Sequence, residues 1–131
     1  MENFRCFAGP HEVALKPLTL LVGENSSGKS SFLAAVRLAW DARGAPPEVD
    51  IFNSNPFGLG GYAQLASHNR ARTARMFRLG FAYGAKIGES TVPVSVETGF
   101  RELNARSRIA FTRTSVTDMW VERRYATDGR V

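Results

Sequence analysis

One short glycine-rich motif constrains this chain more than any other feature. Residues 23–30 read Gly-Glu-Asn-Ser-Ser-Gly-Lys-Ser, which matches the P-loop pattern of a glycine, four residues of any kind, and then Gly-Lys-Ser or Gly-Lys-Thr. At average amino-acid usage, the four fixed positions would arise by accident in roughly one chain of this length in a few hundred. Because a P-loop connects a buried strand to a helix, the motif predicts a strand, a loop and a helix in that order.

The motif also predicts which atoms would hold a nucleotide. Gly23 and Gly28 allow the backbone to curl closely around phosphate oxygens, so that successive N–H groups point inward at a helix N-terminus. Lys29 is predicted to reach the β- and γ-phosphates, and Ser30 to bind Mg²⁺ through its hydroxyl. GTP is disfavoured, because the sequence has no Asn-Lys-x-Asp motif to read a guanine base. The predicted nucleotide-binding residues are Gly23, Asn25, Ser26, Ser27, Gly28, Lys29, Ser30 and Ser31.

Strand and helix patterns surround the motif. Short strands are predicted over residues 3–7 and 11–15, and residues 18–22 are so apolar that they predict a central strand covered on both faces. After the motif, apolar residues at helical spacing predict a helix over residues 30–43, which Gly44 and the following prolines end.

The remainder of the chain divides into a loop region and a run of strands. Residues 45–75 are rich in Gly, Pro and Asn and predict loop with a short helix over residues 62–67. From residue 76 onward the apolar residues alternate, with Phe77 and Leu79 on one strand face and Ile109 and Phe111 sharing another, and residues 119–126 form the last predicted strand. This pattern predicts an antiparallel meander over residues 76–131.

Together these elements predict an α/β fold, with a mixed sheet, one P-loop helix and an antiparallel meander. Residues 1–131 are expected to form a single partial ATPase lobe, in which residues 1–44 hold the first strands, the P-loop and its helix. The pair Asp128-Gly129 is a strong hairpin signal, yet only two residues follow it. We therefore expect the chain to be an incomplete fold.

The composition is typical of a folded globular protein. With 44% hydrophobic and 22% charged residues, the chain can bury a core and is not expected to be disordered. Its one cysteine, Cys6, cannot form an internal disulfide or a zinc site, which predicts a cytoplasmic location. The sequence has neither a secretion signal nor an apolar run of membrane-spanning length, so no membrane partner is expected.

Two stretches resemble a known family. Residues 3–7 read Asn-Phe-Arg-Cys-Phe, and residues 18–33 read Leu-Thr-Leu-Leu-Val-Gly-Glu-Asn-Ser-Ser-Gly-Lys-Ser-Ser-Phe-Leu. They resemble the ATP-binding heads of ABC-class ATPases, in the group that contains SMC, RecF, the OLD-family endonucleases and AAA-labelled phage-defence proteins. The resemblance extends to about residue 85. It implies ATP and Mg²⁺ as cofactors, and a role in DNA transactions or phage defence.

The resemblance assigns two further residues. It implies that Arg5 lies beside the phosphates or base of the nucleotide, with a plain surface arginine as the alternative. It also implies that Gln64 is a Q-loop residue that contacts Mg²⁺ and the attacking water, with a plain surface glutamine as the alternative.

Several motifs of the family are missing. Its members also need a Walker B strand ending in Asp-Glu, a signature loop and a switch histidine, and none is found in this sequence. Without a base that orients water, a P-loop binds nucleotide but barely hydrolyses it. ATPase activity is therefore expected of an intact protein whose second lobe or head dimer supplies these parts, and not of this chain alone. The alternatives are a non-catalytic, nucleotide-responsive interaction module and a small P-loop kinase.

Basic residues and histidines give weaker signals. The formal net charge is +5, and 14 of the 17 basic residues are arginine. His11 and His68 stand far apart, with no metal-ligand or nucleophile pattern around them. A cluster of arginines could line a path for nucleic acid or form an ordinary solvated face, and a nuclease partner is the other expectation. These arginines are Arg70, Arg72, Arg75, Arg78, Arg101, Arg106 and Arg108.

Overall fold

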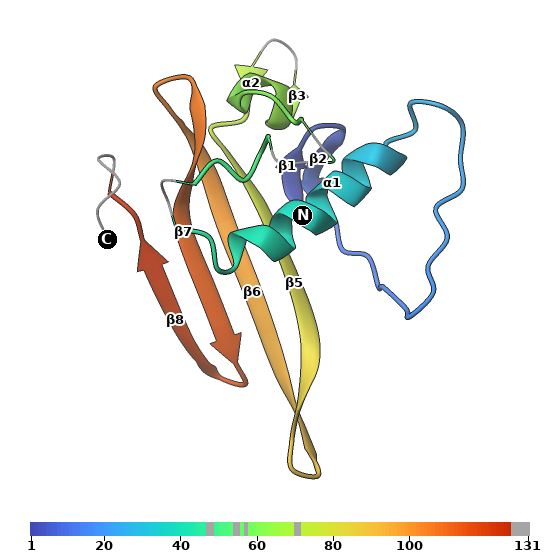
Figure 1. Cartoon of the computed structure of the whole chain (residues 1–131), viewed down its shortest axis with the longest axis vertical. Coiled ribbons are helices and arrows are strands. Elements are labelled where there is room, and N and C mark those ends of the chain that lie inside the picture. The colour runs from blue at the N-terminus through green and yellow to red at the C-terminus, as the bar shows by residue number, and fades with distance from the viewer. Residues whose placement is uncertain (47–48, 54–55, 57, 70–71, 127–131) are drawn as a thin grey trace.

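A long antiparallel meander is the largest element of the molecule (Figure 1). The computed structural model describes residues 1–46, 49–53, 56, 58–69 and 72–126. A six-stranded sheet has the strand order β2-β1-β5-β6-β7-β8, and a separate two-stranded sheet pairs β3 with β4. The strands are β1 (Glu2–Phe4), β2 (Phe7–Pro10), β3 (His68–Asn69), β4 (Arg72–Thr73), β5 (Met76–Ile87), β6 (Ser90–Leu103), β7 (Arg106–Val116) and β8 (Met119–Arg124). The helices are α1 (Lys29–Ala42) and α2 (Tyr62–Leu65).

The meander predicted from alternating apolar residues is confirmed. Each of the strands β5 to β8 pairs with the next one along the chain, and each connection is a two-residue turn. The β6–β7 turn places both Asn104 and Ala105 at positive φ, which is the geometry that matches the twist of a hairpin. Period-two alternation was a sufficient signal here because one face of these strands is buried.

A β-bulge changes one detail of that pattern. The register shifts between Gly99, which lies opposite Phe111, and Phe100, which lies opposite Ile109. Ala110 is therefore an extra residue, and it turns Ile109 and Phe111 to opposite faces of the sheet. The prediction that these two residues share a face was wrong, because alternation along one strand cannot reveal an insertion relative to its neighbour.

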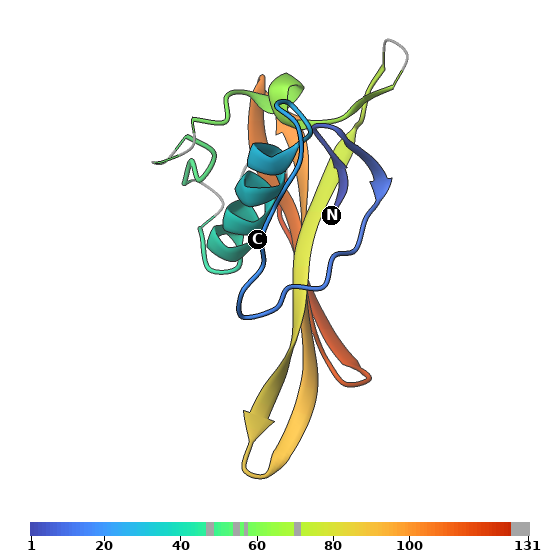
Figure 2. The same cartoon turned by 90° about the vertical axis from the view of Figure 1, so that its right-hand side faces the viewer.

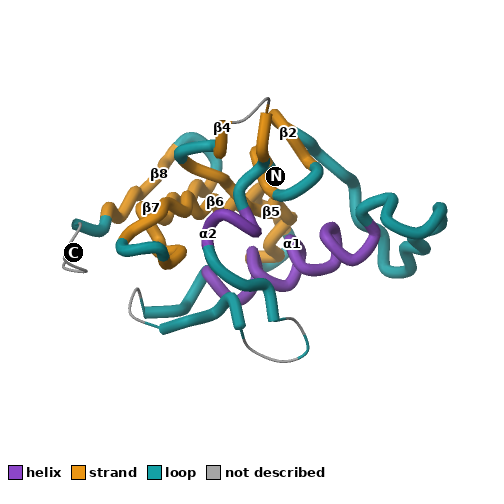
Figure 3. The backbone as a smooth tube through the Cα atoms, turned by 90° about the horizontal axis from the view of Figure 1, so that it is seen from above, coloured by secondary structure: helices purple, strands orange, loops and turns teal. Residues whose placement is uncertain are grey.

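The helix predicted over residues 30–43 is confirmed as α1, with bounds one residue away from those predicted at each end. Its small buried residues, including Ala35 and Ala39, let it lie close to β5, and Figures 2 and 3 show it running along one face of the sheet. Beneath it, Phe77 is fully buried and stacks on Phe100 with ring centroids 4.8 Å apart. The core therefore lies between α1 and this face, which we call the inner face.

The apolar segment before the P-loop differs from the prediction. Residues 11–24 contain no strand, and Leu18, Leu20 and Val22 are 79%, 77% and 91% exposed. The predicted strands over residues 11–15 and 18–22 were therefore wrong for this structure, and so was the mixed sheet, since every pairing between named strands is antiparallel. A strand buried on both faces needs neighbouring strands at its edges, and none of the described strands lies beside this segment.

The other differences are smaller. The predicted strand over residues 3–7 is divided by a turn at Arg5 and Cys6 into β1 and β2. The short helix predicted over residues 62–67 is confirmed as α2, which ends two residues earlier, at Leu65. The loop region also contains the small β3–β4 pair, which the sequence did not predict. The Asp128-Gly129 turn lies outside the described residues. Among those residues, no helix has the length and apolar character needed to span a membrane.

Candidate nucleotide-binding site

The residues of the glycine-rich motif 23–30, called the phosphate loop from here on, lie at the N-terminus of α1. Gly28 is the N-cap of this helix and has a left-handed conformation with φ 93°, which a glycine adopts readily. The first regular helical hydrogen bond runs from the Phe32 N–H to the Gly28 carbonyl, at 2.8 Å. The N–H groups of the first turn have no intrahelical acceptors in any α-helix, so those of Lys29, Ser30 and Ser31 are oriented towards an incoming anion.

Lys29 folds back over the loop. Its ammonium donates to the carbonyl oxygens of Gly23 at 2.7 Å and Glu24 at 2.6 Å, and to the Ser27 hydroxyl at 3.3 Å. The Ser27 N–H donates in turn to the Glu24 carbonyl, at 3.3 Å. The Lys29 ammonium thus lies among oxygens of Gly23, Glu24 and Ser27. Asn25 and Ser26 are exposed on the same loop, and Ser30 is exposed in the first turn of α1.

The turn between β1 and β2 packs against the phosphate loop at Gly28. A Cβ atom added to Gly28 would lie 2.9 Å from the Cys6 sulfur and 3.5 Å from Cζ of Phe7. Glycine is therefore required at this position both for its φ and for the space it leaves. Sequence reasoning missed Cys6 and Phe7 as neighbours of the loop, because nothing in a motif reports which distant turn packs against it.

Arg5 is directed towards the segment around α2. Its backbone N–H donates to the Leu65 carbonyl at 2.7 Å, and its guanidinium donates to the Leu59 carbonyl at 3.3 Å. Its Nε is buried without a partner among the described residues. Arg5 precedes Cys6, which contacts the loop, but the hydrogen bonds of Arg5 tie β1 to the α2 segment.

The side chain of Gln64 caps the N-terminus of α2, whose N-cap residue is Gly61. Its Oε1 accepts the Gly61 N–H at 2.9 Å, and a Cβ on Gly60 would lie 1.5 Å from the same oxygen. The carboxamide oxygen that would bind Mg²⁺ is therefore engaged by the backbone in this conformation. A role at the metal would require Gln64 to release this hydrogen bond.

An Asp–Asn pair orders the loop that leads to α2. Asp50 accepts hydrogen bonds from the Phe52 N–H and from Nδ2 of Asn53, both at 3.0 Å, and Oδ1 of Asn53 accepts the Gly60 N–H at 2.9 Å. The side chain of Asn53 is the main reason that the pKa of Asp50 is lowered from its usual value.

We therefore expect the Asn53→Ala variant to raise the pKa of Asp50 towards its usual value. A carboxyl whose pKa is lowered in the folded state stabilises that state above its unfolded pKa, and this stability is lost as the pH falls through the folded pKa. The variant should thus lose less stability on acidification than the parent. An NMR titration of the Asp50 carboxyl carbon measures the shift, with Glu122 as an internal reference that should not move. An unchanged Asp50 titration would show that Asn53 is not its main partner.

The other candidates are dispersed. Among the described residues, no group of three or more His, Cys, Asp or Glu side chains could hold a metal. An imidazole nitrogen of His11 lies 3.1 Å from the Ala8 carbonyl, and His68 lies in β3. Of the predicted arginine cluster, Arg70 is outside the described residues, whereas Arg78, Arg101 and Arg108 lie on strands of the large sheet.

Comparison with known proteins identifies one similarity. The family model for the AAA ATPase domain matches residues 1–53, a segment that contains β1, β2, the phosphate loop and α1. No curated protein and no solved structure matches the chain. The similarity to this ATPase family thus extends over the first 53 of the 131 residues.

Proposed function

We propose that this chain is the ATP–Mg²⁺-binding lobe of an ATPase of the SMC, RecF and OLD-like group. The observation that carries the proposal is the geometry of Lys29. Its ammonium lies among the carbonyl oxygens of a glycine-rich loop, at the N-terminus of a helix capped by a left-handed glycine. A positive charge, free N–H donors and a close-fitting backbone together provide what a phosphate group needs.

The residues of the loop fit a nucleotide and its metal. On binding, the ammonium of Lys29 would exchange its carbonyl contacts for phosphate oxygens, a stronger charge-assisted interaction. The N–H groups of the first turn of α1 would donate to the same phosphates. The exposed hydroxyl of Ser30 would hold Mg²⁺, which neutralises phosphate charge when bound.

Two exposed apolar surfaces next to the loop support the need for a second lobe. One is the segment of residues 18–22. The other is the part of α1 that leaves large apolar side chains exposed, with Leu33 at 50% and Val36 at 39%, and with Trp40 at 54% although its ring also contacts Phe81 of β5. A helix that is apolar on both sides is characteristic of a buried position. A second lobe or a partner head would cover both surfaces and supply the groups for hydrolysis, and the intact protein would act in DNA transactions or phage defence.

Titration calorimetry of ATP, with and without Mg²⁺, tests the proposal. We expect ATP to bind more tightly when Mg²⁺ is present, and we expect the Ser30→Ala variant to lose most of this difference while keeping its metal-free affinity. The reason is that the hydroxyl of Ser30 contacts only the metal. The matched control is Ser31→Ala. Only the backbone N–H of Ser31 is assigned a role, so this variant should retain the Mg²⁺ effect. The proposal would be contradicted if the parent protein did not bind ATP.

A turnover assay separates this proposal from its alternatives. We expect the chain alone to bind ATP without appreciable hydrolysis, and a fragment that contains the second lobe to restore hydrolysis when it is added. A non-catalytic interaction module would stay inactive with any such fragment. A small P-loop kinase would instead transfer the γ-phosphate to a small acceptor without forming a dimer.

A further inference from the structure

The face of the sheet opposite α1 presents an unusual set of side chains. Strand pairing places Arg78 opposite Gly99 and Gly80 opposite Glu97, whereas the alternating residues Phe77 and Leu79 point to the inner face. We call the Arg78 side the outer face. Figure 2 shows α1 on the inner side and the long β5–β6 hairpin extending beyond the end of the helix.

Positive charge predominates on the outer face. Strand pairing places six arginines from four strands on this face, and three glutamates lie among them. Arg101 and Arg108 lie directly opposite each other on β6 and β7, and like charges in such a pair do not stabilise a sheet. Arg101 also donates to the Tyr125 carbonyl at 3.0 Å, and Arg78 forms an ion pair with Glu2 at 3.4 Å. The arginines are Arg78, Arg101, Arg106, Arg108, Arg113 and Arg124, and the glutamates are Glu2, Glu97 and Glu122.

Aromatic rings flank the central arginine. The guanidinium carbon of Arg113 lies 5.8 Å from the ring centroid of Phe111 and 5.4 Å from that of Trp120, whose side chain is 63% exposed. Arg113 is held there by ion pairs to Glu97, at 3.7 Å, and to Glu122. Hydrogen bonds from Arg124 and then from Arg113 lower the pKa of Glu122.

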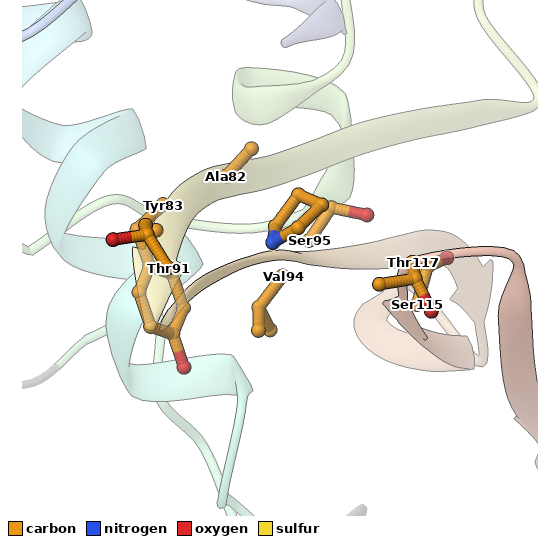
Figure 4. Close-up of a pocket in the computed structure, with 9 residues that line it drawn as sticks. Ala82, Tyr83, Thr91, Val94, Ser95, Ser115 and Thr117 are labelled. Atoms are coloured by element: carbon orange, nitrogen blue, oxygen red, sulfur yellow. The ribbon is translucent and has the colours of Figure 1, made fainter. Parts of the chain in front are cut away.

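A hollow lies near the tip of the β5–β6 hairpin. It has a volume of about 520 Å³, and most of its lining residues, among them Ala82, Ser95 and Ser115, lie on the outer face by strand pairing. Figure 4 shows Thr91 on its hairpin side and Ser115 and Thr117 on the other. Trp120 lies opposite the lining residue Ser115 across β7 and β8, so the indole is next to the hollow.

At several positions of the outer face the residue is a glycine, so no side chain covers the backbone there. A Cβ on Gly99 would lie 2.2 Å from the Phe111 ring, so this ring can lie across the strand only because residue 99 has no side chain. Gly80 and Gly84 occupy the same face of β5. A glycine in a strand is typical of a site where another molecule approaches the backbone closely.

We propose that the outer face binds single-stranded nucleic acid, with its arginines on the phosphates and a base in the hollow against Trp120. Charge complementarity favours a polyanion, because arginines outnumber glutamates on this face and the whole chain carries +5. An exposed indole next to a hollow favours a nucleic acid over an acidic protein, since every base has a flat ring to stack. The surface is separate from the phosphate loop, so this inference does not depend on ATP binding.

Fluorescence anisotropy of a labelled oligo-dT strand tests this assignment on the 131-residue protein. We expect Trp120→Ala to weaken binding roughly 5- to 100-fold, as the loss of one stacked base predicts. Trp120→Phe should restore most of the affinity. Arg78→Gln should reduce the slope of log affinity against log salt by roughly 0.7, as the loss of one phosphate contact on a single strand predicts.

The matched controls lie on the inner side. Trp40 is an exposed tryptophan on α1, and Met119 is the exposed neighbour of Trp120 whose side chain points to the inner face. Trp40→Ala and Met119→Ala should bind oligo-dT like the parent, and so should Lys29→Ala without nucleotide. The assignment is overturned if Trp120→Ala keeps the parent affinity, or if poly-glutamate competes as well as oligo-dT, because the surface would then recognise an acidic protein.

Discussion

Replacement of Lys29 by alanine is expected to weaken ATP binding by roughly 10- to 100-fold, the effect of losing one hydrogen-bonding interaction with a charged group. The ammonium now has three acceptors within the loop, all at 3.3 Å or less. These are neutral oxygens, whereas a triphosphate carries several negative charges, so the exchange favours the nucleotide. Calorimetric titration of the parent and the variant measures the loss.

Two controls make this result specific. Lys86→Ala removes a lysine from the exposed part of β5 and should leave ATP affinity unchanged. Lys29 contacts only exposed parts of the loop, so Lys29→Ala should unfold at nearly the same urea concentration as the parent. Unchanged ATP affinity in a folded Lys29→Ala protein would show that this loop is not the nucleotide site.

The second large effect is on stability, and we expect it at Phe77. The Phe77→Ala variant should lower the free energy of unfolding by about 3–5 kcal/mol, the range for removal of a buried phenylalanine. Its ring is 0% exposed and packs against Phe100 at 4.8 Å, Phe4 at 5.5 Å and Tyr62 at 5.7 Å, measured between centroids. One side chain thus joins β1, α2 and β6 to β5. Urea unfolding followed by circular dichroism measures the change.

The matched control is Tyr83→Ala, on the same strand and the same face. Tyr83 is half-exposed and its ring contact is with Phe81, 6.0 Å away. Its removal should lower stability by less than about 1 kcal/mol. If both variants lost the same stability, the core would not be centred between α1 and the N-terminal part of β5.

The elements that the sequence predicted well are those with a strong local signal. The helix after the phosphate loop follows from a motif that requires a helix and from apolar residues at helical spacing, and α1 begins within a residue of the predicted position. The strands β5 to β8 follow from period-two alternation and the turns between them. The contacts of Lys29 within the loop are local as well, since its acceptors lie two to six positions away.

What could not be predicted depends on contacts between distant residues. The apolar residues 18–22 have the composition of a buried strand, but composition does not show whether neighbouring strands are available to pair with them. The bulge at Gly99 and Phe100 is a relation between two strands. Likewise, the contact of Cys6 with Gly28 joins residues 22 positions apart, and the cap that Gln64 forms depends on how the chain reaches α2.

The strand order of the large sheet has a consequence for how the molecule folds. The hairpins β5–β6, β6–β7 and β7–β8 join residues close in sequence and can form one after another with little loss of chain entropy. The pairing of β1 with β5 instead joins Glu2 to Arg78 and closes a loop of more than seventy residues. We therefore expect the meander to form early and the β1–β2 turn to dock on it later. Because that turn packs against Gly28, we expect the phosphate loop to reach its final conformation late in folding.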